Sequence, residues 1–218
     1  MSDAPKRRPF LHEDSPVMAL ARIITDMVFI NLLFLLTSLP IVTTGASLTA
    51  AYTAVRARSM DKRDKTLFSC YFHAFLANFS QATSLFLILL LCTVILGIDF
   101  WWSIQNLFTL FGPFMSIFSG VLLLLLWGSS LYLFQLLARY KNTNRQHIKN
   151  ACVLAAMHPW NTIRLMLLRL AAMVLMAESV LQGWAAAFPL SLTCFGILFT
   201  LSGRWTEKAI DPAQTGGS

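Results

Sequence analysis

The chain has 218 residues, of which 56% are hydrophobic and 12% are charged, with a formal net charge of +7. A soluble domain carries about a quarter charged residues, so this composition excludes an ordinary water-soluble fold. At about 20 apolar residues per membrane crossing, the chain holds five or six crossings and leaves no room for a separate catalytic domain.

Five apolar segments are each long enough to cross a membrane as an α-helix. In chain order they are residues 18–39, 82–101, 112–137, 161–181 and 185–201. Pro40 ends the first segment. A polar leader precedes that segment, which is longer than the roughly 7–15-residue core of a signal peptide, so we expect no cleavage.

The segment 41–55 is harder to assign, because 15 helical residues cover only about 22 Å of a hydrocarbon core that is roughly 30 Å thick. Basic residues gather on the cytosolic side of membrane proteins. The leader, with its basic residues 6–8, and the loop 56–65 both reach that side if the segment folds back after Pro40 as a sixth crossing. The alternative, five spans with an outer N-terminus, places the basic leader on the wrong side.

The six-span topology places both termini in the cytosol, the loop 103–109 outside, and every lysine and arginine except Arg169 at or beyond the cytosolic boundary. The tryptophans near predicted boundaries agree, since Trp favours the membrane interface; they are Trp101, Trp102 and Trp184 outside, and Trp160 and Trp205 inside. We therefore predict an all-α, polytopic membrane bundle of five to six transmembrane helices. It consists of a cytosolic leader (1–16), one transmembrane domain (17–205) and a cytosolic tail (206–218).

Two basic-side stretches, residues 68–79 and 146–158, are amphipathic. In the first, one helical face carries four phenylalanines, namely Phe68, Phe72, Phe75 and Phe79. Each stretch precedes an apolar span, so we expect two amphipathic helices that lie on the cytosolic membrane surface.

Two charges lie deep within predicted spans, where an ionisable side chain costs about 2.5–3.5 kcal/mol at the helix centre and usually has a partner. Asp26 and Arg169 each lie eight residues from the cytosolic end of their span, which is a depth of about 12 Å. We hypothesise that they form an ion pair within the membrane. The alternatives are a local pair between Asp26 and Arg22 and an Arg169 side chain that reaches the headgroups.

Small residues recur every four positions in two segments, which is typical of helices whose backbones approach closely. They are Ala46, Ala50 and Ala54 in the short segment, and Gly112, Ser116 and Gly120 in the fourth span. We expect the short segment to pack on the first span and the fourth span to pack on another internal helix or a second protein. Asp99 and Glu178 lie near the predicted outer boundary. They are either ordinary acids of the membrane interface or groups that bind a substrate or a proton.

No pattern indicates catalysis, a metal or a cofactor. The four cysteines are scattered singly, at Cys70, Cys92, Cys152 and Cys194, and the four histidines have no pairing spacing, at His12, His73, His147 and His158. No phosphate loop and no Ser/His/Asp spacing occurs. The distribution of positive charge points to the lipid bilayer as partner rather than to nucleic acid.

Two elements carry a resemblance: Leu-Pro-Ile-Val-Thr-x-Gly at residues 39–45, followed by Tyr52, and Asn-Phe-x-Gln-Ala-Thr at residues 78–83. Over roughly residues 15–90 the chain resembles the YesL-like family of bacterial integral membrane proteins. The resemblance implies a small helical protein of the bacterial cell membrane with no established activity and no catalytic residues. It also implies an accessory role in carbohydrate uptake, beside sugar ABC-transporter permeases.

Two functions follow as expectations. The first is a non-catalytic membrane accessory that associates with a sugar ABC-transporter permease or with itself. The alternative is a small transporter or channel that acts alone, with a polar path supplied by hydroxyl residues of the short segment, namely Thr43, Thr44, Ser47, Thr49 and Thr53.

Overall fold

The computed structural model describes residues 16–59 and 66–181, and within these ranges it is all-helical, with no strand. The elements are α1 (Pro16–Ser38), the 3-10 helix η1 (Ile41–Thr43), α2 (Thr44–Ser59), α3 (Leu67–Gln105), α4 (Gly112–Arg139), α5 (Asn144–Met157) and α6 (Pro159–Leu181). The prediction of an all-α fold is confirmed for this part of the chain. The leader, the predicted span 185–201 and the tail lie outside the described residues.

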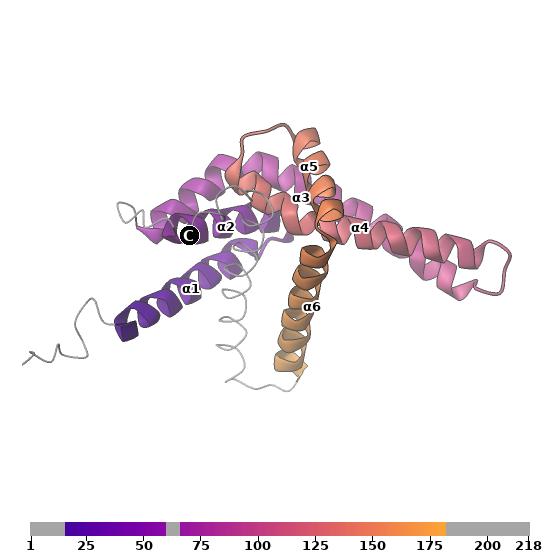
Figure 1. Cartoon of the computed structure of the whole chain (residues 1–218), viewed down its shortest axis with the longest axis horizontal. Helices are drawn as coiled ribbons and strands as arrows, with labels where there is room; N and C mark the ends of the chain where they lie inside the picture. Colours follow the sequence, from indigo (N-terminus) through magenta and orange to yellow (C-terminus); the bar gives the residue numbers. More distant parts are fainter. Residues whose placement is uncertain (1–15, 60–65, 182–218) are drawn as a thin grey trace, which may run out of the picture.

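A proline turn joins α1 to α2. Pro40 has no backbone N–H and cannot continue α1, which ends at Ser38. The Thr43 backbone N–H donates to the Pro40 carbonyl at 2.9 Å, and the Thr43 hydroxyl donates to the Thr37 carbonyl at 2.6 Å. These bonds close the turn, so that α2 packs back on α1 (Figure 1). The fold-back predicted after Pro40 is therefore present.

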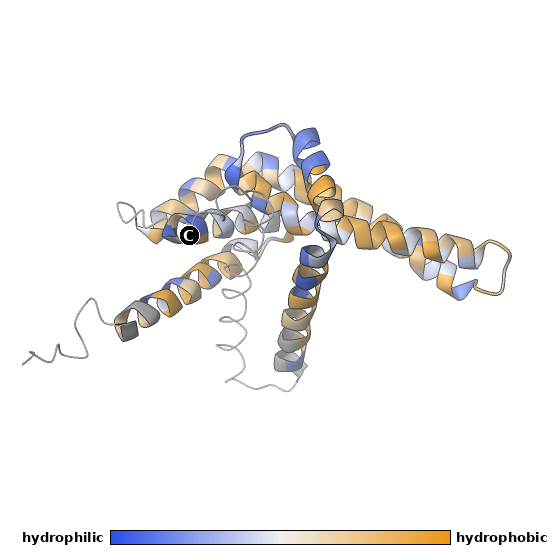
Figure 2. Cartoon of the chain, viewed as in Figure 1, coloured by the Kyte–Doolittle hydropathy of each residue, from blue (hydrophilic) through white to orange (hydrophobic). Residues whose placement is uncertain are grey.

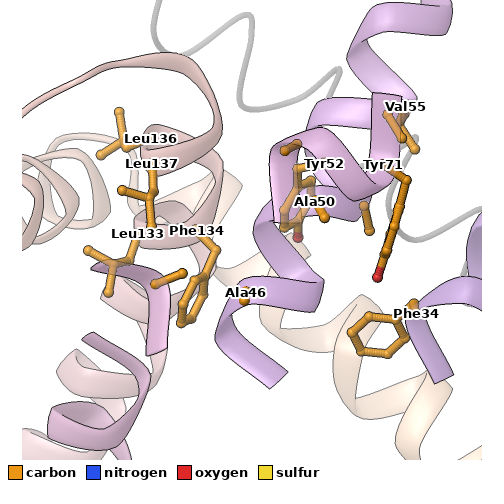
Figure 3. Packing of buried hydrophobic residues seen from close by; sticks show 14 of the residues in the cluster. Phe34, Ala46, Ala50, Tyr52, Val55, Tyr71, Leu133, Phe134, Leu136 and Leu137 are labelled. Carbon is orange, nitrogen blue, oxygen red and sulfur yellow. The ribbon is translucent and has the colours of Figure 1, made fainter. Parts of the chain in front are cut away.

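The core is built around α2, although α2 is short and weakly apolar. The small residues Ala46, Ala50 and Ala54 are fully buried. In Figure 3, Ala46 and Ala50 lie between Phe134 of α4 and Tyr71 of α3. The most extensive neighbour of α2 is α3, and not α1 as the sequence suggested.

Gly45 of α2 lies in close contact with α3. A Cβ atom on Gly45 would lie 2.5 Å from the Ala82 carbonyl oxygen and 2.6 Å from the Phe86 Cβ. Because no side chain fits there, the α2 backbone rests directly on α3. The turn between α1 and α2 therefore lies beside residues 82–86 of α3.

The structure has one helix where the sequence predicted two. The expected surface helix 68–79 and span 82–101 both belong to α3, which runs unbroken for 39 residues, or about 58 Å. Thr66 caps its N-terminus, and no proline or glycine interrupts the segment before Gly97. The second amphipathic stretch does form a separate helix, α5, which starts with a capping box between Thr143 and Gln146.

The C-terminal part of α3 and the N-terminal part of α4 project together from the other helices (Figure 1). We call residues 87–127 the distal hairpin. Most of its large apolar side chains are exposed, and in Figure 2 most of this arm has the colour of hydrophobic residues, with paler and hydrophilic turns near its tip. In the described part of the chain, three helices are long and apolar enough to span a membrane, namely α1 over Ala21–Ser38, α3 and α4.

The lengths along α3 bear on the predicted topology. The charge pattern placed the Pro40 turn and the loop 103–109 on the same, outer side of the membrane. In the structure the turn lies beside Phe86, whereas α3 ends at Gln105, about 28 Å farther along the helix. That distance is close to the thickness of the hydrocarbon core, roughly 30 Å. The two loops therefore lie at opposite ends of a membrane-length segment.

Two glycines provide a matched stability test of the packing at α2. We expect Gly45→Ala to lower the unfolding free energy by about 1–3 kcal/mol, because its Cβ overlaps the backbone of α3. Gly97→Ala is the control, since a Cβ there meets nothing within 4 Å, and the change should stabilise α3 by up to about 1 kcal/mol. Thermal unfolding in detergent measures both, and equal effects would contradict the close approach.

Candidate functional site

Asp26 pairs with a basic residue on the neighbouring helix. Its carboxylate lies 2.5 Å from Nε of Arg58, and both side chains are partly exposed. The two residues are each 16 positions from residue 42, so the α1–α2 hairpin brings them opposite one another. The loop assigned to residues 56–65 begins later than expected, because α2 continues to Ser59 and carries Arg58 on its last turn.

Arg169 of α6 has a different partner. One guanidinium nitrogen donates to the Tyr52 hydroxyl of α2 at 3.1 Å. The hypothesised ion pair between Asp26 and Arg169 is therefore not formed, because the hairpin gives Asp26 a nearer cation and Arg169 faces a neutral phenol. Tyr52 itself is buried.

Arg169 also lines a groove of about 650 Å³ between four helices. We call this cavity the Arg169 groove. Apart from Thr93, Ser130 and Arg169, its walls are apolar or aromatic; the lining residues include Leu48 of α2, Phe86 and Leu90 of α3, and Leu123, Trp127 and Phe134 of α4. The arrangement of a large apolar cavity with few polar groups is typical of a site for an amphiphilic ligand.

The small residues of α4 serve packing inside the hairpin. A Cβ on Gly120 would lie 3.2 Å from the Phe100 ring of α3, and Gly112 lies against the Asn106 carbonyl in the turn before α4. Ser116 donates to the Pro113 carbonyl of its own helix. Gly120 thus faces an internal helix, α3, whereas Gly112 faces the turn that precedes its own helix.

The two predicted boundary acids do not meet. Asp99 lies on α3, where its carbonyl accepts the Ser103 hydroxyl at 2.7 Å, and Glu178 lies near the C-terminal end of α6. Figure 1 shows that the α3–α4 loop and the end of α6 point to separate corners of the molecule. No shared site forms from these two acids.

The hydroxyl groups of α2 bond to their own helix. Ser47, Thr49 and Thr53 each donate to the carbonyl four residues earlier, at 2.9–3.0 Å. Each of these hydroxyl groups therefore uses its O–H donor on a backbone carbonyl of its own segment.

Tyr71 links three helices, since its hydroxyl lies 2.7 Å from the Thr37 hydroxyl and donates to the Ser47 carbonyl at 3.4 Å.

His147 of α5 is one of the four histidines for which the sequence indicated no metal site. It is fully buried, neither ring nitrogen has a hydrogen-bond partner among the described residues, and burial lowers the pKa of the imidazole below its ordinary value. The neutral ring is thus favoured, and stability falls as the pH drops through the ordinary pKa of about 6.5. Within residues 16–59 and 66–181, no group of three His, Cys, Asp or Glu side chains could hold a metal ion.

The sequence did not predict Arg58 as the partner of Asp26, nor Tyr52 as the partner of Arg169. The position of Arg58 was available from the symmetry of the hairpin about residue 42. Tyr52 and Arg169 are 117 residues apart, and no local pattern connects them.

The described part of the chain is all-helical, and three of its helices are long and apolar enough to span a membrane. These two features are those of a helical membrane protein. Residues 27–100 match the family described as "Protein of unknown function, DUF624". The matched region holds the end of α1, all of α2 and most of α3, and so it includes Tyr52 and Arg58 but not Arg169. No curated protein and no solved structure matches the chain.

A charge exchange tests the pairing of Asp26. We expect Asp26→Arg and Arg58→Asp each to destabilise the protein by about 1 kcal/mol, which is the upper range for a partly exposed pair. The double exchange should recover most of the loss, because it restores opposite charges. The control, Asp26→Arg with Arg169→Asp, should recover none; recovery there would support the original ion-pair hypothesis. Thermal unfolding in detergent is the measurement.

Proposed function

We propose that this chain is a non-catalytic protein of the bacterial cell membrane that acts by binding another membrane protein. The observation that carries the proposal is the distal hairpin, which projects from the bundle with its apolar side chains uncovered. Asp99 is its single charged residue. An arm of this kind is suited to lipid and to helices of a partner, and not to catalysis in water.

One surface of the hairpin is suited to a partner helix. Between lipid and protein there is no hydrophobic gain, so helices in a membrane associate where small residues let their backbones approach. Gly97 of α3 offers such a place, because a Cβ there would meet nothing within 4 Å. Thr93 lies one turn earlier and is exposed, which gives a small-xxx-small pair on α3.

The partner class comes from the resemblance of residues 39–45 and 78–83 to the YesL-like family. That resemblance favours a sugar ABC-transporter permease and a role in carbohydrate uptake. The alternative, transport by the chain alone, receives less support, since the hydroxyl groups of α2 are bonded to their own helix.

For the topology, we propose that the distal hairpin crosses the membrane and that the basic parts of the chain, both termini included, remain in the cytosol. No lysine or arginine occurs from residue 66 to residue 138, and basic residues favour the cytosolic side. The α1–α2 hairpin also keeps its two basic ends on one side if it enters the membrane interface and returns without a full crossing. Its turn then lies on the cytosolic side of the distal hairpin.

Cysteine labelling tests this topology in a variant without native cysteines. Phe108→Cys lies in the fully exposed loop after α3, and Val42→Cys lies in the exposed proline turn. An impermeant thiol reagent should label Phe108→Cys in intact cells, and should label Val42→Cys only after permeabilisation. The cysteine-free parent is the control. Labelling of both sites from outside would restore the six-span arrangement and contradict this proposal.

Affinity purification in mild detergent tests the partner. The wild-type chain should co-purify with a permease identified by mass spectrometry, and Gly97→Leu should reduce its recovery by about tenfold, because an added side chain of this size blocks close helix approach. Val121→Phe is the control, an apolar enlargement on the exposed face of α4. Solute flux by the pure reconstituted chain, without a co-purified permease, would favour the transporter instead.

A further inference from the structure

In the part of the chain that the structure describes, the Arg169 groove has a positive charge and no acidic side chain in its lining. Tyr52 accepts one hydrogen bond from Arg169, but a guanidinium has five N–H donors and a neutral hydroxyl offsets none of its charge. Among the described residues that line the groove, Arg169 is the single charged one, and the other walls are almost entirely apolar. A cation in such surroundings is costly unless an anion pairs with it. The groove is therefore complementary to a ligand with one anionic end.

The shape and position of the groove indicate what the rest of that ligand is. A volume of about 650 Å³ is in the range of small-molecule sites, roughly 300–1,000 Å³. Leu90 of α3 and Leu124 of α4 line the groove and are also exposed on the apolar surface of the hairpin. The groove thus opens sideways onto the surface that faces hydrocarbon, and an acyl chain can enter it from the membrane without passing through water.

We propose that the Arg169 groove binds an anionic phospholipid, with the lipid phosphate at the Arg169 guanidinium and one acyl chain along the apolar wall. Phosphate oxygens suit the planar fork of arginine, which can donate two parallel hydrogen bonds. Tyr52 positions the guanidinium at the groove by accepting its other bond. Because α2, α3, α4 and α6 all contribute to the lining, the bound lipid holds α6 against the core. This site needs no protein partner and so stands apart from the proposed accessory function.

Native mass spectrometry of the full chain in detergent tests the proposal with three probes. Phosphatidylglycerol is anionic, phosphatidylcholine with the same acyl chains is zwitterionic, and glycerol 3-phosphate has the anionic group without acyl chains. We expect phosphatidylglycerol to bind at least about tenfold more tightly than phosphatidylcholine, and glycerol 3-phosphate not to bind, because recognition needs both the charge and the chain. Equal binding of the two lipids would overturn the assignment, and so would binding of glycerol 3-phosphate alone.

Variants locate the site. Arg169→Gln should remove the preference for phosphatidylglycerol, whereas Arg164→Gln, an exposed cation of the same helix outside the groove lining, should preserve it. Ser130→Phe fills the groove while keeping Arg169, and should weaken both lipids. If Arg169→Gln does not fold, the lipid binding of Ser130→Phe tests whether the groove is the lipid site. Unchanged preference in folded Arg169→Gln, or unchanged lipid binding in Ser130→Phe, would overturn the proposal. Gly97→Leu changes a residue of the partner surface that is outside the groove lining, so it should leave lipid binding intact.

Discussion

The close approach of α2 to α3 at Gly45 is the constraint on which the remaining arrangement depends. A helix of 16 residues with little apolar area gains less from burial than its longer neighbours, so it is held by backbone proximity and by small side chains that permit it. Once α2 is seated there, the proline turn places α1 beside it. The same seating directs Tyr52 toward α6, so the groove and its arginine follow from the packing of three alanines and a glycine that take no part in binding.

The molecule divides along α3 into two parts with different chemistry. The half next to α1 and α2 has the ion pair, the Tyr71 link to Thr37 and Ser47, and polar contacts such as Gln81 to the Asn142 carbonyl at 2.7 Å. The distal half is apolar and is built from the packing of α3 on α4. Directional bonds therefore define the bundle, while lipid contacts or a partner helix define the environment of the arm. The Arg169 groove lies where these two parts meet.

Local chemistry explains which features could be predicted from the sequence. Pro40, the alanine spacing and the long apolar runs act within a few turns, so the helices and the hairpin were predictable. The continuity of α3 was not, because an amphipathic start followed by an apolar run also describes two helices in different orientations. The prediction of an Asp26–Arg169 pair was wrong because equal depth in the membrane does not show that two helices are neighbours. Asp26 and Arg58 lie on the two arms of one hairpin, at equal distances along the chain from its turn, so they are neighbours as well as equally deep. Tyr52 and Arg169 meet only through the packing of α2, α4 and α6, which no spacing in the sequence reveals.

The same distinction applies to the membrane topology. The positive-inside rule assigns a side to each basic segment and is satisfied by any even number of crossings between two segments on one side. Zero is an even number, so the basic residues on either side of the α1–α2 hairpin do not require that hairpin to reach the far surface. The length of α2, about 24 Å for 16 residues, is short of a full crossing, and its turn lies beside Phe86 and not beside the end of α3. Charge fixes the sides of the loops, whereas the depth of the helices between them depends on the neighbour against which α2 packs.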